Sequence, residues 1–300
     1  MRLVNMRCSK LRELLEGAPL SFLMEAHDGV SARIVEHAGF GGIWASGLSI
    51  STVLGLRDCS EASWTEVLRT VGYMSDATGV PILLDGDGGY GNFNAVRLLV
   101  RKLAQIGIAG VCIEDTLFPK TNSFVGEKHP LLDIGEFCGK IRAAKDSQSE
   151  DQFCVVARVE ALVSGRGMSE ALERAHRYRE AGADAIMIHS KKSEPDEILE
   201  FCAQWKRHAP LVIVPTKYYK APTDALHKAG VSTVVWANHN LRAAVQAMRY
   251  ISNSIYVHKS VAQVENSIES LDSLFSLMDY DELARAEVRY LPKSGDHGGG

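Results

Sequence analysis

Long apolar runs and clustered basic residues are both missing from the 300-residue chain. No run approaches the roughly 18 apolar residues of a membrane-spanning helix, and the N-terminal segment MRLVNMRCSKLRELLEG is charged, without the apolar centre of a signal peptide. Lysine and arginine are scattered and the formal net charge is −4, which disfavours a nucleic-acid-binding face. We therefore expect a soluble cytoplasmic protein that binds neither membranes nor nucleic acids.

Paired cysteines are also lacking, because none of the six cysteines belongs to a CxxC motif. Most of them stand inside apolar segments, where buried free thiols are expected rather than disulfides. Their positions are Cys8, Cys59, Cys112, Cys138, Cys154 and Cys202.

Short apolar runs recur along the chain and alternate with helical patterns. The runs are apolar on consecutive residues, which is typical of parallel strands covered by helices on both faces. Eight such units predict a (β/α)8 TIM barrel of about 250 residues. The clearest helical pattern, FNAVRLLVRKLAQIG, has one apolar face and ends at Gly107. The expected strands are residues 21–25, 42–45, 81–85, 110–114, 154–158, 185–189, 211–215 and 232–237.

More helix follows the eighth strand than a barrel needs. One helical segment is expected from Leu241 to about Tyr256, and another from about Val261 to Tyr290. No linker or composition break divides the chain, so we predict one barrel domain with a C-terminal helical extension over residues 1–292. Residues 293–300 have the composition of a disordered or added tail.

Polar residues stand at the C-terminal end of every expected strand. In a barrel these ends converge on one mouth, where active sites lie. Each residue alone could be an ordinary polar loop residue, but their occurrence at all eight ends indicates a site. They are Glu25, His27, Ser46, Asp85, Asp87, Glu114, Asp115, Arg158, Glu160, His189, Ser190, Thr216, Lys217, Asn238 and His239.

The segment LLDGDGGYGN admits three interpretations. It contains the GxGxxG fingerprint of dinucleotide-binding proteins, but Asp85 and Asp87 would repel a diphosphate at that turn, and eight strands disfavour an open Rossmann sheet. Its opening resembles a calcium loop, yet the twelfth position from Asp85 is Val96 instead of glutamate. The interpretation that remains is a site for a hard cation.

Asp85, Asp87 and Glu114, at the ends of two consecutive strands, form the predicted metal site. Mg²⁺ prefers few protein carboxylates together with water and substrate oxygens. We therefore predict that Asp85 binds Mg²⁺ directly, while Asp87 and Glu114 hold its waters. The residues alone also leave open a purely structural carboxylate cluster.

Several longer motifs carry a resemblance to a known family. The runs LMEAHDGVSARIVEHAGFGGIW, VARVEALVSG, AGADAIMIHSKK, VPTKYYKAPTD and VWANHNLRA, and above all EDTLFPKTNS, cover nearly the whole chain. With them the chain resembles the phosphoenolpyruvate mutases of the isocitrate lyase/phosphoenolpyruvate mutase superfamily, whose gating-loop signature is EDKxFPKxNS. Lyases of the superfamily carry a catalytic cysteine in a KKCG-like motif of this loop, and this chain has none there.

The resemblance implies a Mg²⁺-dependent isomerase. Its members move a phosphoryl group between the enol oxygen and C3 of pyruvate, which interconverts phosphoenolpyruvate and phosphonopyruvate in phosphonate biosynthesis. The metal would chelate the carboxylate and oxo groups of the pyruvyl unit and neutralise the enolate charge. The resemblance also implies a homodimer or homotetramer in which the C-terminal region is exchanged between subunits.

Site residues follow from the resemblance position by position. Ser46 and the backbone N–H groups of Gly47 and Leu48 would receive the substrate carboxylate, with Trp44 as a wall. Arg158, His189, Asn122 and the region of Ser123 would bind the phosphoryl oxygens, and the arginine fork suits a tetrahedral anion.

Catalysis and water exclusion are assigned in the same way. Asp58, in GLRDCSEASW, matches the family acid near the migrating phosphorus, as a transient nucleophile or as an orienting group. Without the resemblance, Asp58 would be interpreted as an exposed turn acid. Lys120, Asn122 and their neighbours from Pro119 to Ser123 would form a lid that excludes water.

Some positions depart from the family pattern. Thr116 replaces a lysine after the two acids, and Ala45 replaces a glycine. Gly86 and Gly88 replace an alanine and a threonine in the metal-bearing turn, where added glycine is expected to loosen the backbone.

Other functions remain open at this point. A phosphonopyruvate hydrolase would share the fold and the metal site but cleave the P–C bond with water. A lyase or oxaloacetate-type hydrolase acting on another 2-oxo acid is a second alternative. From another class, the chain could be a noncatalytic binding protein on a retained barrel.

Overall fold

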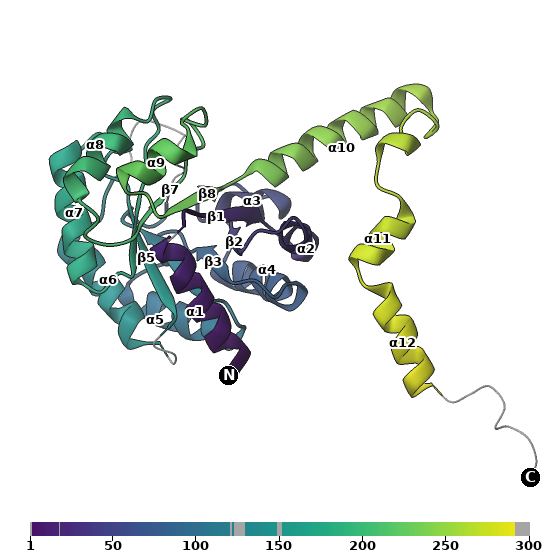
Figure 1. Ribbon diagram of the computed structural model, residues 1–300, viewed down its shortest axis with the longest axis horizontal. Helices are drawn as coiled ribbons and strands as arrows, with labels where there is room; N and C mark the ends of the chain where they lie inside the picture. The colour runs from purple at the N-terminus through teal and green to yellow at the C-terminus, as the bar shows by residue number, and fades with distance from the viewer. Residues whose placement is uncertain (1, 18, 121, 123–129, 149–151, 292–300) are drawn as a thin grey trace, which may run out of the picture. The chain divides into compact units, whose positions relative to one another are not determined.

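The computed structural model describes residues 2–17, 19–120, 122, 130–148 and 152–291. Eight parallel strands form a closed barrel in the order of the sequence, with β8 hydrogen-bonded to β1 (Figure 1). The predicted (β/α)8 fold is confirmed, and each predicted strand is present with its ends within two residues. The strands are β1 (Ser21–Ala26), β2 (Gly42–Ala45), β3 (Ile82–Asp85), β4 (Gly110–Glu114), β5 (Cys154–Val159), β6 (Ala185–Ile188), β7 (Leu211–Ile213) and β8 (Thr233–Trp236).

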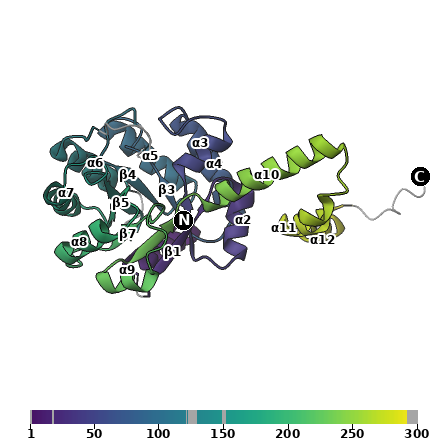
Figure 2. The ribbon, with the colours of Figure 1, turned by 90° about the horizontal axis from the view of Figure 1, so that it is seen from above.

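Helices surround this barrel, as the view from above shows (Figure 2). An additional N-terminal helix, α1 (Arg2–Glu16), contacts strands from opposite sides of the barrel, namely β1, β3, β5 and β8, so it covers the N-terminal end of the barrel. The others are α2 (Gly29–His37), α3 (Gly47–Val53), α4 (Trp64–Ala77), α5 (Phe93–Gln105), α6 (Ile134–Asp146), α7 (Met168–Glu180), α8 (Asp196–Trp205) and α9 (Thr223–Ala229).

Helix α5 illustrates how the sequence determines an element. The side chain of Asn92 caps its first turn by accepting hydrogen bonds from Asn94 N and Ala95 N. The predicted apolar face is buried against the strands, and Gly107 adopts the left-handed φ of +78° that ends the helix.

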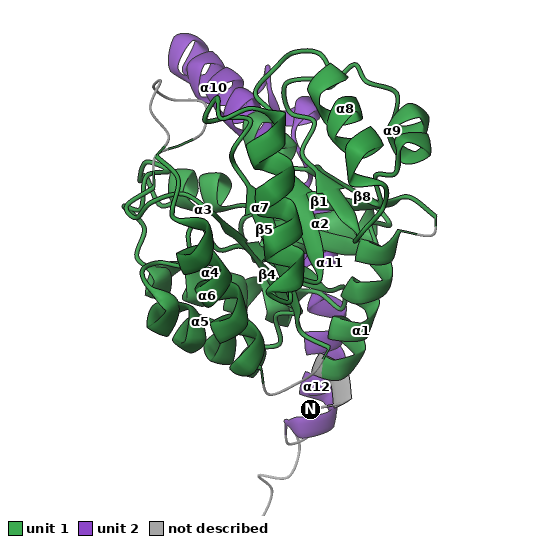
Figure 3. Cartoon of the chain, turned by 90° about the vertical axis from the view of Figure 1, so that its left-hand side faces the viewer, with its two compact units in different colours: residues 1–242 green, residues 243–300 purple. Residues whose placement is uncertain are grey.

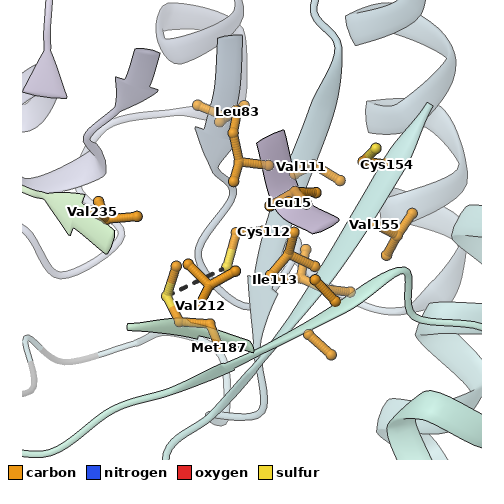
Figure 4. Packing of buried hydrophobic residues seen from close by; sticks show 14 of the residues in the cluster. Leu15, Leu83, Val111, Cys112, Ile113, Cys154, Val155, Met187, Val212 and Val235 are labelled. Carbon is orange, nitrogen blue, oxygen red and sulfur yellow. Dashed lines mark hydrogen bonds between the residues drawn. The ribbon is translucent and has the colours of Figure 1, made fainter. Parts of the chain in front are cut away.

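The core fills both the barrel and the space between strands and helices. Side chains from facing strands meet inside the barrel, where Cys112 Sγ lies 4.0 Å from Met187 Sδ (Figure 4). Leu15 of α1 is buried with them. The core thereby holds the C-terminal strand ends rigidly at the opposite end of the barrel.

Residues 243–300 form a second compact unit (Figure 3). Helix α10 (His239–His258) begins in the first unit and continues into the second, so no linker separates them. The segment expected after it is broken into the 3₁₀ turn η1 (Glu265–Ser267), α11 (Leu271–Leu277) and α12 (Tyr280–Tyr290). The last break follows from Asp279, which has a left-handed φ of +57° and caps α12. The proposal of a single domain over residues 1–292 stays a prediction.

None of the helices in the described parts of the chain combines the length and the apolar composition needed to cross a membrane.

Candidate active site

A cavity opens at the C-terminal ends of the barrel strands. Its volume is about 50 Å³, room for a few water molecules. Apart from Gly47, Asp87 and Ser123, all the residues predicted to bind the metal or the substrate or to act in catalysis line it. The other polar strand-end residues that do not line it are Glu25, His27, Asp115, Glu160, Ser190, Lys217 and His239. Ser123 lies outside the described residues. The lining residues are Trp44, Ser46, Leu48, Asp58, Asp85, Glu114, Lys120, Asn122, Arg158, His189, Val214, Thr216, Ala237 and Asn238.

The three predicted metal acids are buried at neighbouring strand ends. Asp85 ends β3 and Glu114 ends β4, while the backbone N–H of Glu114 donates to the Asp87 carbonyl at 2.8 Å. A Cβ atom placed on Gly47 would lie 3.3 Å from both Asp85 Oδ2 and Asp87 Oδ1. The two carboxylates therefore face the same point, and glycine at position 47 leaves that point open.

Burial makes the negative charge of these acids costly. It raises the pKa of Asp87 to about 7, although Lys120 opposes the shift, and it raises the pKa of Glu114 as well. Among the described residues, no group of three or more His, Cys, Asp or Glu side chains is arranged to hold a metal by itself. The predicted ligands are all carboxylate oxygens, the ligand type that Mg²⁺ takes together with water and substrate oxygens, so the metal site stays a prediction.

Lys120 stands above these acids on the loop that follows β4. Its Nζ contacts Asp58 Oδ1 at 2.9 Å and forms a second ion pair with Asp87 Oδ1. Burial lowers the pKa of Lys120, but the carboxylates around it, Asp87 and Glu114 foremost, outweigh burial and raise it well above its ordinary value. Lys120 is therefore a fixed positive charge in the cavity.

The same loop is attached to the α3–α4 connection. Lys120 N donates to Ser60 Oγ at 3.0 Å, and Asn122 Nδ2 donates to Asp58 Oδ2 at 2.6 Å. Asp58 is thus brought to the lid, and the interpretation of it as an exposed turn acid is wrong, because its side chain is only 8% exposed.

Arg158 and His189 form the basic side of the cavity. Arg158 Nη2 lies 2.9 Å from His189 Nδ1, and Arg158 Nη1 lies 3.4 Å from Glu114 Oε2. Glu160 contacts the Arg158 guanidinium and lies 3.0 Å from His189 Nδ1. Burial would raise the pKa of Glu160, but these two neighbours outweigh it and lower the pKa to about 2. Glu160 therefore remains ionised and holds both side chains toward the cavity.

The residues predicted to bind the substrate carboxylate lie at the start of α3. Ser46 caps this helix by accepting from Ser49 N at 3.2 Å, and Trp44 is buried below it. Gly47 N donates to Asp85 Oδ2 at 3.4 Å. The region is in place beside the acids, while its role toward a substrate stays a prediction.

Two of the departures from the family pattern, Thr116 and Gly86, are explained by their contacts in the structure. Thr116 Oγ1 donates to Glu114 Oε1 at 2.8 Å, so a neutral donor stands where a lysine was expected. A Cβ on Gly86 would lie 2.6 Å from Val111 Cγ2, so this glycine is required by close packing. The expectation that it loosens the turn does not fit this packing.

The cavity has an uncharged wall at the ends of β7 and β8, formed by Val214, Thr216, Ala237 and Asn238. Thr216 and Asn238 were among the polar strand-end residues expected there, whereas Val214 and Ala237 were not predicted. Buried Lys140 of α6 donates to the Gly88 carbonyl at 2.9 Å and so supports the turn that holds Asp87. A lysine at a buried helical position was a usable signal, but the carbonyl it meets is 52 residues away.

Asp115 serves a different purpose from its neighbour Glu114. Its carboxylate accepts from Tyr178 Oη at 2.7 Å, from Arg174 Nη1 at 3.1 Å and from Glu160 N at 2.9 Å. Burial raises the pKa of Asp115 to about 6, against these hydrogen bonds. It faces α7 and belongs to the scaffold.

Known proteins share this sequence and fold. The family profile described as phosphoenolpyruvate phosphomutase matches residues 11–256. A phosphoenolpyruvate phosphomutase of Tetrahymena pyriformis is 52% identical over 286 residues, which cover 95% of each chain. The crystal structure of a phosphoenolpyruvate phosphomutase from Streptomyces platensis subsp. rosaceus superposes with a TM-score of 0.93 at 42% identity, covering 95% of this chain and 99% of that one.

A hydrolase is also similar, at greater distance. The phosphonopyruvate hydrolase of Variovorax sp. (strain Pal2) is 37% identical over 285 residues, 94% of this chain and 98% of its own. A phosphonopyruvate hydrolase crystallised with oxalate and Mg²⁺ superposes with a TM-score of 0.89 at 36% identity, covering 95% of this chain and 99% of that one. The family profile, the sequence identity and the barrel fold all agree. The chain therefore belongs to the phosphoenolpyruvate phosphomutase family.

Proposed function

We propose that this protein is a Mg²⁺-dependent phosphoenolpyruvate phosphomutase that interconverts phosphoenolpyruvate and phosphonopyruvate. The observation that carries the proposal is the lid: Lys120 and Asn122 both contact Asp58 above a cavity with acids on one side and Arg158 and His189 on the other. Acids suit a metal that chelates a 2-oxo acid, and the arginine–histidine pair suits a phosphoryl group.

The reaction conserves every atom of the substrate. The P–O bond to the enol oxygen breaks and a P–C bond forms at C3 of the same pyruvate enolate, with no net proton uptake. Bound Mg²⁺ would supply charge neutralisation at the enolate oxygens, held by Asp85 with Asp87 and Glu114. Arg158 and His189 bind the phosphoryl oxygens during transfer, and Glu160 keeps both in position.

Asp58, Lys120 and Asn122 act at the other face of the phosphoryl group. Asn122 donates to Asp58, which orients that carboxylate, and Lys120 offsets its charge. A closed lid excludes water, which would otherwise take the phosphoryl group. The identity to the phosphomutase of Tetrahymena, higher than that to the hydrolase, supports transfer over hydrolysis.

Phosphorus NMR of the purified protein with phosphonopyruvate and Mg²⁺ tests the proposal. Phosphoenolpyruvate as the main product supports the mutase, and free phosphate as the main product identifies a hydrolase instead. An unchanged spectrum supports the noncatalytic alternative and contradicts the proposal.

We also propose that the chain forms a homodimer or homotetramer through its C-terminal unit. Large apolar side chains are exposed along its helices, including Tyr256 at 73%, Leu271 at 69% and Val288 at 83%. Apolar surface of this kind is typical of subunit interfaces. A cytoplasmic location is proposed from the six free thiols, which suit a reducing compartment.

A further inference from the structure

Asn238 occupies the N-cap position of α10, directly after β8. Its carbonyl accepts the first helical hydrogen bond, from Arg242 N at 3.2 Å. The side chain of an N-cap asparagine ordinarily accepts from the backbone N–H of the second or third helical residue, here Asn240 or Leu241.

In this structure the side chain of Glu25 on β1 caps α10 instead. Its Oε2 accepts from Asn240 N at 2.9 Å and from Leu241 N at 3.2 Å, and its Oε1 lies 2.5 Å from His27 Nδ1. Glu25 is fully buried, and a carboxylate is favoured at a helix N-terminus. The side-chain carboxamide of Asn238 is therefore not needed to cap the helix.

The released carboxamide lines the cavity of the site instead. Asn238 is only 7% exposed, and its Oδ1 is buried without a hydrogen-bond partner among the described residues. Leaving a buried polar atom unpaired destabilises a fold, so such an atom in a cavity indicates a group completed by a ligand or by water.

The wall around Asn238 carries no charge. Thr216, Val214 and Ala237 are its neighbours in the cavity lining, while the charged lining residues lie at the ends of β3 to β6, on the loop after β4 and on the α3–α4 connection. Carboxylate, oxo and phosphoryl oxygens only accept hydrogen bonds at neutral pH, apart from a protonated phosphoryl oxygen. Rotation by 180° about the last side-chain bond exchanges Oδ1 and Nδ2, so the unpaired position can present an N–H group to such an oxygen.

Resting on the proposed function, we infer that Asn238 is a substrate-binding residue of this site. Its Nδ2 donates to an anionic oxygen of the 2-oxo acid substrate from the uncharged wall, opposite the metal acids. The neutral donor adds binding and orientation without adding a second cation to a cavity that already holds Lys120 and Arg158.

The variant Asn238→Asp separates substrate binding from capping. Aspartate caps a helix as well as asparagine does, so a residue that only caps would tolerate the change. As a substrate ligand it would lose its donor and repel the anion. We expect the affinity for phosphonopyruvate with Mg²⁺ to fall at least about 10-fold, the equivalent of one lost hydrogen bond to a charged group. It is read from the KM if the protein turns this compound over, and from a calorimetric Kd if it does not.

Two probes locate the contact. A loss with phosphonopyruvate but not with oxalate places Asn238 at the tetrahedral group, and a loss with both places it at the carboxylate or oxo group. Asn5→Asp, which makes the same change on the exposed face of α1, should leave both affinities unchanged. Oxalate has no phosphoryl group to transfer, so its Kd is measured without turnover. A parent that binds phosphonopyruvate but does not convert it contradicts the proposed function and still tests Asn238.

Asn238→Ser provides a second variant, because serine also caps but is too short to replace the amide. Its affinity for phosphonopyruvate should fall by a similar factor, with the melting temperature within a few degrees of the parent. Unchanged affinity in either folded variant overturns the inference, and so does a parent that binds neither probe.

Discussion

Asn122 on the lid donates a 2.6 Å hydrogen bond to Asp58 on the connection between α3 and α4. The two residues are 64 positions apart, and the neighbouring Lys120–Asp58 ion pair joins the same two segments beside the cavity. If Asn122 also faces the transferring phosphoryl group, as proposed, closure of the loop and chemistry are coupled.

Replacing Asn122 by alanine should therefore change both the rate and the products. The lost hydrogen bond to a charged group costs about 1.5–3 kcal/mol, roughly one to two decades in rate if it acts in the transition state. Water entry should also raise the share of pyruvate and free phosphate formed from phosphonopyruvate, measured by phosphorus NMR. Asn5→Ala, at an exposed position of α1, is the control. An unchanged rate and product ratio would remove Asn122 from the mechanism.

Asp85→Ala should abolish turnover and weaken Mg²⁺ binding while the fold persists. Asp85 and Asp87 face one point beside Gly47, so removing Asp85 leaves the cation without its direct ligand. Glu114→Gln should have a smaller effect, because waters rearrange in an outer shell. Mn²⁺ titration followed by electron paramagnetic resonance measures the affinity, with exposed Asp146→Ala as the matched control. Parent-like metal affinity in Asp85→Ala would exclude this site.

Gly86→Ala should destabilise the protein by about 1–3 kcal/mol, because the new Cβ would overlap Val111. The cost should shrink when Val111 is also alanine, which a double-mutant cycle in urea measures. Gly139→Ala on α6 is the control, since nothing lies within 4 Å of its Cβ position and alanine favours a helix. Additive effects of the Gly86 and Val111 changes would contradict direct contact.

Cysteine reactivity should be confined to one position in the native protein. Burial raises the pKa of Cys154 to about 12 and that of Cys202 to about 11, which removes the reactive thiolate at neutral pH. Cys59 is the only cysteine that is not buried, and its pKa is raised by partial burial and by Glu61. We expect iodoacetamide at pH 8 to label Cys59 alone, and all six thiols after unfolding, as read by mass spectrometry. Native labelling of Cys154 would contradict the packing.

Sedimentation velocity at micromolar concentration should show a dimer or a tetramer. The apolar side chains exposed on α10, α11 and α12 require a partner surface to become buried. Leu271→Lys together with Val288→Lys should shift the distribution toward smaller species, whereas Lys259→Arg, a conservative exposed change, should not. A stable monomer of the unmodified chain would rule the assembly out.

The barrel was predictable because its signal is local. Each strand is a short apolar run, and the acids of β3 and β4 stand at the ends of such runs, so Asp85 and Glu114 could be placed together from the fold alone. The apolar face of α5 was equally visible as a 3.6-residue period.

The features that were not predicted depend on contacts that the sequence pattern does not show. The need for glycine at position 86 comes from the closeness of Val111 on the next strand. The role of Thr116 comes from the hydrogen bond that its hydroxyl donates to Glu114. Asn238 was expected at the mouth of the barrel, but its freedom from capping depends on Glu25, which is 215 positions from Asn240, whose amide it caps. No pattern along the chain encodes such an exchange of partners.

Glu114 and Asp115 are adjacent in sequence but face opposite sides of the barrel wall, one toward the cavity and the other toward Arg174 and Tyr178. A survey that scores only growth or product would find that changes at either acid lower the output, and would group the two as one motif. We expect measured protein abundance to separate them: Asp115 variants should be depleted from the soluble fraction, while Glu114 variants should accumulate as intact protein with reduced turnover. We thus expect two neighbouring acids to limit different quantities, Asp115 the yield of folded protein and Glu114 its turnover.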